Sequence, residues 1–474
     1  MKNFVKSIIL ASMAIVLIAS CNNGSKVVPG DAIFKATIQG IKNTSVLLME
    51  ANPFIVTPDT VKVDDLGNFI YTKHLESPTY FEVVVGSKNR FPIFLLPGDT
   101  MFMSVDVAQF GATQKFSGNA SIYNNYITEY TNSSNEFQKN IYTQFSKPEE
   151  EAVKLMDSLR DNHLAALESL KNANSDLNPY FIKMEKARIL YEWALWYNIY
   201  PMYFRYLNKT ESFQTTPEYD SYLGAVDIND SSLLSLGIYQ SFLDTYVGKE
   251  MENYYKDDEL RAANPSTIKY RLELIDRLFT NNAVKQVLAY KAVMDYVSYD
   301  GIKDYDLYFD YFKTICPNEG FQKIVNGVLD KWQHLKKGMP AYNFSFVNMD
   351  GKEVTMADFK GKYVYVDVWA TWCNPCLGEI PSLKKMEEEF KGKNIAFVSI
   401  SVDQTQDPWR AMVVNDTLKG VQLWAGQAKE FSEFYKITGI PRFMLFDQEG
   451  NILEASATRP SGGVDKQIAE LPGL

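Results

Sequence analysis

Cysteine and positive charge are both scarce in this sequence. Only four of the 474 residues are cysteines, which is far too few for a scaffold built from disulfide bonds. Lys and Arg together number 48 against 58 Asp and Glu, so the formal net charge at pH 7 is -10. Binding of nucleic acid depends on Lys and Arg that neutralise phosphates. The composition therefore excludes a disulfide-built domain and argues against a nucleic-acid partner.

What is present indicates a folded protein of several domains. The apolar fraction is 46%, the charged fraction is 22%, and Tyr and Phe number 29 each, a composition typical of globular chains. A chain of 474 residues is too long for one hydrophobic core, since cores stop growing beyond about 250 to 300 residues. We expect a large buried interior divided among roughly two to four domains.

The N-terminal residues have the layout of an export signal. Lys2 and Lys6 precede an uncharged apolar run, Ile8 to Ala19, and this run is shorter than the ~20 residues that a membrane-spanning helix needs. We therefore predict a signal peptide over residues 1–20 and an exported mature protein.

The end of this signal carries a lipidation motif. Leu17-Ile18-Ala19-Ser20-Cys21 resembles the lipobox of bacterial lipoproteins, in which the cysteine receives lipid. The resemblance implies a lipid anchor on Cys21, followed by a polar tether over 21–30. The alternative is an ordinary secretory signal or an uncleaved anchor, with Cys21 incidental.

Residues 31–115 follow a period of two that is interrupted by turn residues. Alternation is clear over 60–63 and 101–105, and turn residues stand at 66–68 and 97–99. Alternation with this punctuation is typical of short strands. We predict a small all-β domain, and nothing in it suggests catalysis.

Residues 116–335 change to a period of 3.6. Apolar residues recur at steps of three and four, as in Ile189, Trp193, Trp196 and Tyr200, which is the pattern of amphipathic helices. The aromatic stretch could be a face for a partner, but at helical spacing such a stripe usually belongs to the core. We predict a helical region of undefined role.

The pattern over 336–474 alternates strand and helix. Residues 363–368 are nearly all β-formers, as in a strand buried on both faces. Apolar residues then mark one helical face over 377–390, and a second buried strand over 395–402 completes a β-α-β unit. The predicted fold class is multidomain, with an N-terminal all-β domain, a central α-helical region and a C-terminal α/β domain.

Two cysteines, Cys373 and Cys376, lie where the first of these buried strands passes into the helix. In this context a C-x-x-C predicts a redox pair. Cys373 would lie at the helix N-terminus, where unpaired N–H groups and the dipole favour the thiolate, and it is the predicted nucleophile. Cys376, one turn further in, would attack the mixed disulfide and release the reduced substrate.

The alternative for such a pair is half of a zinc site. Zinc would need two further thiolates or imidazoles, and the only histidines are His74, His163 and His334. The remaining cysteine, Cys316, has no partner spaced for chemistry and is predicted to be a small buried hydrophobe. We predict no metal and no bound cofactor.

The motifs around the cysteines resemble those of the TlpA/ResA-type periplasmic thioredoxins. The shared features are Gly361-Lys362, Trp369-Ala370-Thr371-Trp372-Cys373-Asn374-Pro375-Cys376, Glu379-Ile380-Pro381 and Gly439-Ile440-Pro441. The resemblance implies a thioredoxin-like fold over 336–474. The segment 31–115 is similar to a β-rich domain of unknown function that often precedes thioredoxin modules in bacterial lipoproteins.

The resemblance also implies roles for two carboxylates. Asp367 matches a buried acid that would exchange a proton with Cys376, because desolvation raises the pKa of a carboxyl group. Glu379 matches a carboxylate at the active site. The alternatives are a structural role for Asp367 and, for Glu379, a carboxylate that favours the start of the helix.

The remaining implied positions concern the substrate. Pro441 matches the cis-proline of thioredoxins, in a turn that faces the two cysteines. The backbone of Ile440 would pair with an extended substrate segment, and Trp372 would shield the cysteines and contact substrate. Arg442 follows this turn and is expected to be a surface arginine.

The function that follows is reduction of disulfides in exported proteins by a lipid-anchored thiol-disulfide oxidoreductase facing the periplasm. Asn374-Pro375 lacks the histidine of strongly oxidising relatives, which favours the reducing direction. The expected partners are disulfide-containing exported proteins, a membrane-bound electron donor, and the membrane itself through lipid on Cys21.

Two alternative functions stay open at this stage. Peroxiredoxins share the fold, so the protein could be a thiol peroxidase, although Cys373 is not in the proline-threonine-cysteine segment which that activity predicts. The other alternative is a non-enzymatic scaffold or binding lipoprotein that works through its helical region. That alternative predicts an intact phenotype after Cys373→Ser and Cys376→Ser.

Overall fold

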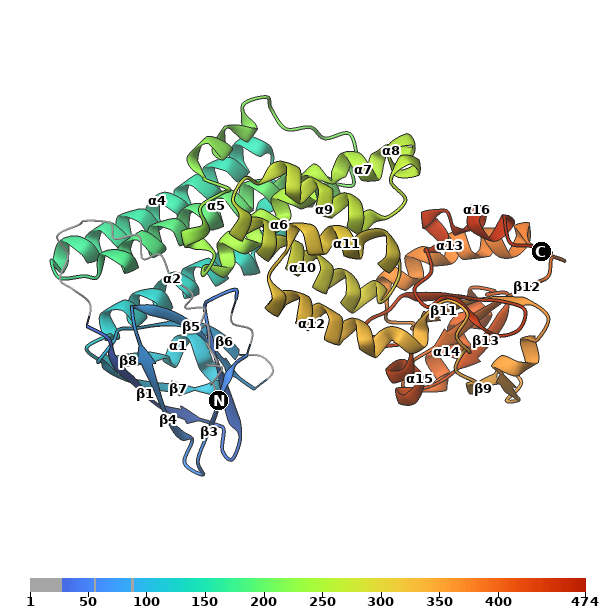
Figure 1. Ribbon diagram of the computed structural model, residues 1–474, viewed down its shortest axis with the longest axis horizontal. Coiled ribbons are helices and arrows are strands. Elements are labelled where there is room, and N and C mark those ends of the chain that lie inside the picture. Colours follow the sequence, from blue (N-terminus) through green and yellow to red (C-terminus); the bar gives the residue numbers. More distant parts are fainter. Residues whose placement is uncertain (1–27, 55–56, 87–88) are drawn as a thin grey trace, which may run out of the picture. The chain divides into compact units, whose positions relative to one another are not determined.

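The computed structural model describes residues 28–54, 57–86 and 89–474 (Figure 1). The predicted signal peptide over 1–20, the candidate lipidation site Cys21 and most of the predicted tether lie outside the described residues. Two compact units make up the chain. The first comprises the residues up to Ala51 together with Thr57–Glu136, and the second comprises Phe137–Leu474 and a short segment that begins at Asn52.

The first unit contains two four-stranded sheets, in the orders β4-β1-β7-β8 and β3-β2-β5-β6. Their strands are β1 (Gly30–Gln39), β2 (Ser45–Glu50), β3 (Asp59–Lys62), β4 (Asn68–Leu75), β5 (Thr79–Val85), β6 (Asn89–Leu95), β7 (Thr100–Asp106) and β8 (Lys115–Gly118). Every second residue of β1 from Ala32 to Ile38 is buried, because successive side chains of a strand point to opposite faces. This confirms the all-β class. The last strand runs across the predicted boundary at 115, and the short helices η1 (Val107–Gln109) and α1 (Phe110–Thr113) precede it.

The helix α2 (Ser121–Lys139) begins in the first unit, and the helices that follow belong to the second. They are α3 (Ile141–Phe145), α4 (Glu149–Ala173), α5 (Pro179–Asn208), η2 (Tyr219–Ala225), η3 (Ser231–Leu233), α6 (Gly237–Glu250), α7 (Glu252–Lys256), α8 (Asp258–Ala263), α9 (Thr267–Leu278), α10 (Asn282–Asp300), α11 (Tyr305–Ile315), α12 (Glu319–Leu329) and η4 (Asp330–Leu335). The predicted helical class is confirmed. Among the helices of the described chain, none has both the length and the apolar character that crossing a bilayer requires.

The aromatic stripe of α5 is core, as its spacing indicates. Ile189, Trp193, Trp196 and Tyr200 are all at most 7% exposed. Burying aromatic side chains on this scale stabilises a helix packing face by far more than its intrinsic helix propensity does.

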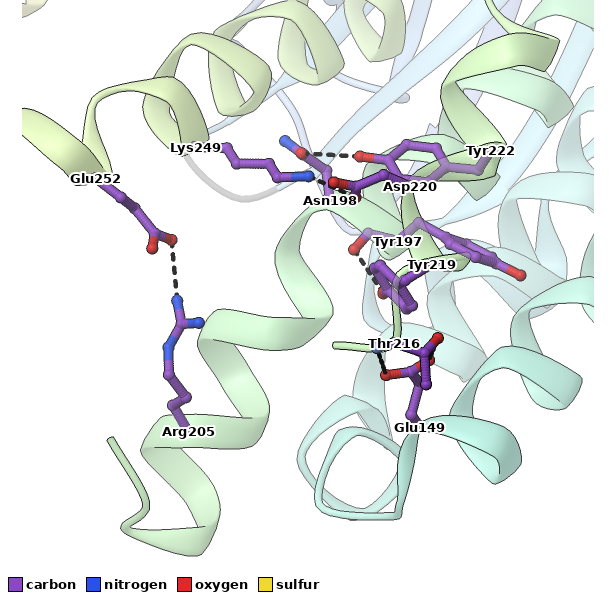
Figure 2. A network of polar contacts seen from close by, with 10 residues as sticks. All are labelled: Glu149, Tyr197, Asn198, Arg205, Thr216, Tyr219, Asp220, Tyr222, Lys249 and Glu252. Carbon is purple, nitrogen blue, oxygen red and sulfur yellow. Dashed lines mark hydrogen bonds and ion pairs between the residues drawn. The ribbon is translucent and has the colours of Figure 1, made fainter. Parts of the chain in front are cut away.

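Polar contacts hold the neighbours of α5 in place, and Figure 2 shows a set of them. The donors and acceptors come from α4, α5, α6, α7, the turn before η2 and η2 itself. The contacts are Thr216 to Glu149 (2.6 and 3.0 Å), Tyr219 to Tyr197 (2.8 Å), Tyr222 to Asn198 (3.1 Å), Lys249 to Asp220 (2.6 Å) and Arg205 to Glu252 (2.9 Å). These contacts join side chains and backbone groups of neighbouring helices, which favours a structural role for this network.

The C-terminal part of the second unit is built on a seven-stranded sheet in the order β10-β9-β13-β12-β11-β14-β15. Its strands are β9 (Ser345–Asn348), β10 (Glu353–Thr355), β11 (Tyr363–Trp369), β12 (Ile395–Ser401), β13 (Val421–Trp424), β14 (Arg442–Phe446) and β15 (Ile452–Glu454). Its helices are η5 (Met356–Phe359), α13 (Asn374–Glu389), α14 (Gln406–Asn415), α15 (Lys429–Phe434), η6 (Pro460–Gly462) and α16 (Val464–Ala469).

The predicted β-α-β unit is present in this sheet. All seven residues of β11 are buried, and β11 pairs in parallel with β12 and antiparallel with β14. A parallel pair needs a crossover connection, and α13 provides it. The α/β class of the C-terminal domain is confirmed, and its central strand β11 leads directly to the two cysteines.

Candidate functional site

Cys373 and Cys376 form a disulfide with an S–S distance of 2.03 Å. Cys373 is the N-cap of α13, and its Sγ accepts a hydrogen bond from the backbone N–H of Cys376 at 3.2 Å. Pro375 lies in the first turn of this helix, where the missing proline N–H removes no helical bond. When the disulfide is reduced, the same N–H group and the helix dipole would stabilise a thiolate on Cys373.

The turn before the cysteines is held by a residue that the sequence analysis did not single out. The carboxylate of Asp403 accepts hydrogen bonds from the backbone N–H and the hydroxyl of Thr371 and from the hydroxyl of Ser401. Asp403 is only 3% exposed. A buried carboxylate with several donors fixes local geometry, so this contact positions the turn that ends at Cys373.

The turn that faces the cysteines is the one that contains Pro441. The peptide bond between Ile440 and Pro441 is cis, and Ile440 packs against the buried cluster that contains Cys373 and Cys376. The structure therefore brings the two distant motifs together. Neither motif alone indicates that the Pro441 turn lies close to the two cysteines, because this proximity depends on the pairing of β14 with β11.

Arg442, the first residue of β14, differs from the expectation of a surface arginine. Its exposed fraction is 3%, because residues of α10 cover it. Its guanidinium lies 5.3 Å from the centre of the Tyr299 ring.

A groove of about 920 Å³ runs beside the disulfide. Trp372, which is 67% exposed, lies along it together with Val368, Ile437 and Ile440. Trp372 and Ile440, two of the three residues predicted to bind substrate, are therefore brought to one concave surface, and the third, Pro441, follows Ile440 directly. Lys429, Ser432 and Glu433 of α15 line the same groove.

Asp367 lies on β11, six residues before Cys373, and is 8% exposed. Burial is the largest cause that raises the pKa of Asp367 to about 8, followed by the negative charges of Glu379 and Glu387, while a hydrogen bond from Ser399 opposes the shift. Ser399 is the partner of Asp367 in the register of β11 and β12. Such a carboxyl group can gain and lose a proton near neutral pH.

Glu379 is buried near Asp367, but its oxygens are engaged by the turn η6. One oxygen accepts from the backbone N–H of Ser461 at 3.0 Å and the other from the Ser461 hydroxyl at 2.9 Å, with an Arg459 nitrogen 3.9 Å away. The carboxylate thus ties α13 to η6 and acts on Asp367 through its charge.

Glu387 is a second acid that the sequence analysis did not single out. Burial raises the pKa of Glu387 to about 7, although the positive charges of Lys419 and Lys384 oppose that shift. Its position two turns after Glu379 on α13 could have indicated that the two acids share a helix face. The sequence pattern does not indicate how far that face removes the Glu387 carboxylate from water, because this depends on the tertiary packing.

Cys316 is fully buried, and burial raises the pKa of its thiol to about 12. Its Sγ lies 3.6 Å from the carbonyl oxygen of Gln286. A thiol with so high a pKa is inert as a nucleophile. Over the residues that the structure describes, no three His, Cys, Asp or Glu side chains lie together so that they could hold a metal ion.

Comparison with known proteins points to the same part of the chain. Residues 336–470 match the Redoxin family. The thiol-disulfide oxidoreductase ResA of Bacillus thuringiensis subsp. konkukian is 27% identical over 140 residues, which cover 30% of this chain and 80% of that protein. The thioredoxin-like protein YneN of Bacillus subtilis is 29% identical over 121 residues, which cover 25% of this chain and 69% of YneN.

A solved structure shows the same sequence similarity. The thioredoxin domain of a thiol-disulfide oxidoreductase from Bacteroides vulgatus is 31% identical, and the alignment covers 29% of this chain and 97% of that one with a TM-score of 0.27. Together with the cysteine pair at the start of α13, the Redoxin match and the similarity to ResA identify residues 336–470 as a thioredoxin-like thiol-disulfide oxidoreductase domain of the TlpA/ResA type.

Proposed function

We propose that this protein is an exported, lipid-anchored reductase that passes electrons from a membrane-bound donor to disulfides of extracytoplasmic proteins. The observation that carries the proposal is the position of Cys373, which caps α13 next to the cis-proline turn at Ile440 and Pro441. This geometry gives one cysteine a stabilised thiolate and an adjacent backbone to which substrate can bind.

The reaction begins with both cysteines reduced. The Cys373 thiolate attacks one sulfur of the substrate disulfide, which forms a mixed disulfide and expels the other substrate sulfur as a thiolate. Cys376 then loses its proton and attacks the Cys373 sulfur, which releases the second substrate thiolate. Two electrons pass to the substrate, both substrate thiolates take up protons, and the Cys373–Cys376 disulfide remains.

Asp367 is the proposed acceptor of the proton from Cys376. The support is its burial and its pKa of about 8, because proton transfer is most effective when the pKa of the group lies near the working pH. Glu379 serves in this proposal as a neighbouring charge that keeps the pKa of Asp367 high.

Trp372 and the backbone of Ile440 are the proposed substrate contacts. Both line the groove beside the disulfide, and an extended peptide can pair with an exposed backbone segment as a strand does. The substrate class is therefore an unfolded or flexible protein segment that carries a disulfide.

The anchor and the location form a separate part of the proposal. The motif that ends at Cys21 favours lipidation, which would hold the protein on the membrane facing the periplasm, near a membrane-bound donor. Mass spectrometry of the mature N-terminus tests this directly. A diacylated or triacylated Cys21 supports the anchor, whereas an unmodified N-terminus at another residue contradicts it.

The direction of electron flow is tested by the reduction potential of the Cys373–Cys376 pair, measured by equilibration with thiol buffers of known potential. A value near or below about -250 mV supports a reductase that needs an electron supply. A value near about -120 mV would mark an oxidant instead.

Trapping the mixed disulfide tests the roles of the two cysteines. The Cys376→Ser variant should accumulate covalent adducts with substrate proteins, and the Cys373→Ser variant, as the matched control, should not. If the protein were a thiol peroxidase instead, it would turn over hydrogen peroxide directly, at a rate that does not depend on added protein disulfides.

A further inference from the structure

The helical region contacts the thioredoxin-like domain beside the substrate turn. The Tyr299 hydroxyl, at the end of α10, donates a hydrogen bond to the carbonyl oxygen of Pro441 at 3.3 Å. The adjacent residue Asp300 accepts a hydrogen bond from the Ser456 hydroxyl at 2.9 Å. One helix end is thus bonded to the cis-proline turn and to the segment that follows β15.

The first residue after this turn is part of the same contact. The Arg442 guanidinium lies 5.3 Å from the centre of the Tyr299 ring, within the range of a cation–π interaction. Burial lowers the pKa of Arg442, and the nearby Asp300 carboxylate opposes that shift. An arginine that is 3% exposed would lose much of this environment if α10 moved away.

A second contact lies in the middle of the groove wall, where α15 ends. His334, in η4, places Nε2 2.9 Å from the carbonyl oxygen of Phe434, and the two rings meet edge to face at 4.9 Å. Phe434 ends α15, whose residues Lys429, Ser432 and Glu433 line the groove. The helical region therefore contacts the wall formed by residues 429–441 at two places, near its middle at Phe434 and at its end at Pro441.

The two contacts are connected within the helical region by a close packing of backbone on a ring. Gly301 follows α10 with φ +67°, and a Cβ at this position would lie 2.4 Å from a ring carbon of Trp332 in η4. Only glycine allows this approach. The end of α10, which carries Tyr299, and η4, which carries His334, therefore form one packed element.

From these contacts we propose that the helical region positions the substrate-binding wall, with Tyr299 and His334 as its positioning residues. This inference rests on the proposed reduction of protein disulfides at Cys373. The two residues hold the wall 429–441 in the conformation that receives an extended substrate. They do not touch the cysteines, so they act on substrate affinity and leave the intrinsic reactivity of the dithiol unchanged.

The test compares a protein substrate with a small one, using the full-length chain with dithiothreitol as reductant. Insulin is the protein disulfide, and bis(2-hydroxyethyl) disulfide is the small disulfide that does not need the wall. Tyr299→Phe should raise KM for insulin about three- to tenfold, as expected for loss of one hydrogen bond, with kcat and the small-disulfide rate unchanged. His334→Gln should act in the same direction.

The matched control is Tyr311→Phe, which also removes a hydroxyl of the helical region, one that donates to Asp276 at 3.1 Å. It should leave KM for insulin unchanged. If Tyr299→Phe and His334→Gln behave like this control, or if they slow both disulfides equally, the positioning role is wrong while reduction at Cys373 stands. If the wild-type chain reduces neither disulfide, the proposed function itself is wrong.

Discussion

Two aspartates in the second compact unit show how differently its helical region and its thioredoxin-like domain treat a carboxyl group. In the helical region, a hydrogen bond from Lys285 is the largest cause that lowers the pKa of Asp276, and one from Tyr311 lowers it further. In the redox domain, burial and two neighbouring carboxylates raise the pKa of Asp367 to about 8. The same residue type is thus a stabilising anion in one place and, in the other, a carboxyl group that holds its proton up to neutral pH.

The two regions differ in whether the neighbours of a polar group stabilise or destabilise its charge. In the helical network of Figure 2, Lys249 and Arg205 meet carboxylates, and the Tyr222 hydroxyl meets the Asn198 side-chain oxygen, which is how a fold satisfies buried polar atoms. Asp367 faces Glu379 and Glu387, which destabilise its charge. A fold keeps such an arrangement at a cost in stability, and that cost is typical of functional sites.

The largest expected effect that sharpens this comparison is kinetic. Asp367→Asn removes the proposed proton acceptor for Cys376, so the step that resolves the mixed disulfide should slow about 10²-fold at pH 7. Stopped-flow fluorescence on the reduced protein measures it. Asp276→Asn is the matched control in the helical region and should leave this rate unchanged. Equal rates for wild type and Asp367→Asn would remove Asp367 from the mechanism.

The second effect is on stability and should have a distinctive pH dependence. The folded-state pKa of Asp367, about 8, lies above the ordinary value of 3.8 for an aspartate, so this residue contributes stability below pH 4 that is lost as the pH rises towards 8. Asparagine cannot ionise and avoids that loss. Between pH 4 and pH 8, the oxidised Asp367→Asn variant should gain more than about 1 kcal/mol relative to wild type.

Urea unfolding of the oxidised proteins at pH 4, 6 and 8 measures this difference. A difference that stays constant over the range would mean that the Asp367 carboxyl group titrates with an ordinary pKa in the fold.

A third, smaller effect concerns the coupling between acids. The charge of Glu387 raises the pKa of Asp367, so Glu387→Gln should shift the pH profile of the resolving step to lower pH, by less than about one unit. The shift is read from rates between pH 5 and pH 9. Glu389→Gln removes an exposed carboxylate of the same helix that is not among the charges acting on Asp367, so it should leave the profile in place, and the same shift in both variants would contradict a direct charge effect of Glu387.

The smallest effect is expected in the helical region. The lowered pKa of Asp276 means that it contributes stability above about pH 4, which is lost as the pH falls through its folded-state pKa. The Asp276 side chain is 40% exposed, so screening limits the contribution to about 0.5 kcal/mol. Asp276→Asn should therefore destabilise the protein slightly at pH 7 and not at pH 2. If Asp276→Asn instead destabilised the protein more at pH 2 than at pH 7, the carboxylate of Asp276 would not be stabilised in the fold, and the difference from Asp367 would not hold.

Much of the redox site could be predicted because its signals are local. The continuous run of β-formers in β11, the proline and the cysteines at the start of α13, and the turn at Pro441 each depend on neighbouring residues. The chemistry of the cysteine pair follows from residue type and spacing, whereas the role of the Pro441 turn was expected from the resemblance to the thioredoxins.

Other parts of the site depend on residues far apart in the sequence. Ser461 bonds to Glu379 across 82 positions, and Tyr299 reaches Pro441 across 142. The expectation of a surface position for Arg442 was wrong because the helix that covers it belongs to another region of the chain. A sequence pattern indicates which face of a helix is apolar, but it does not indicate what packs on that face.

By itself, the sequence determined that the protein has a β-rich, a helical and an α/β part, and it predicted redox chemistry at Cys373 and Cys376, since periodicity and motif spacing are properties of short segments. Only the tertiary structure decided which groups lose contact with water. Burial raised the pKa of Asp367 to about 8, because the electrostatic cost of a buried charge depends on everything packed around it. The packing of α10 likewise brought the Tyr299 ring against the Arg442 guanidinium.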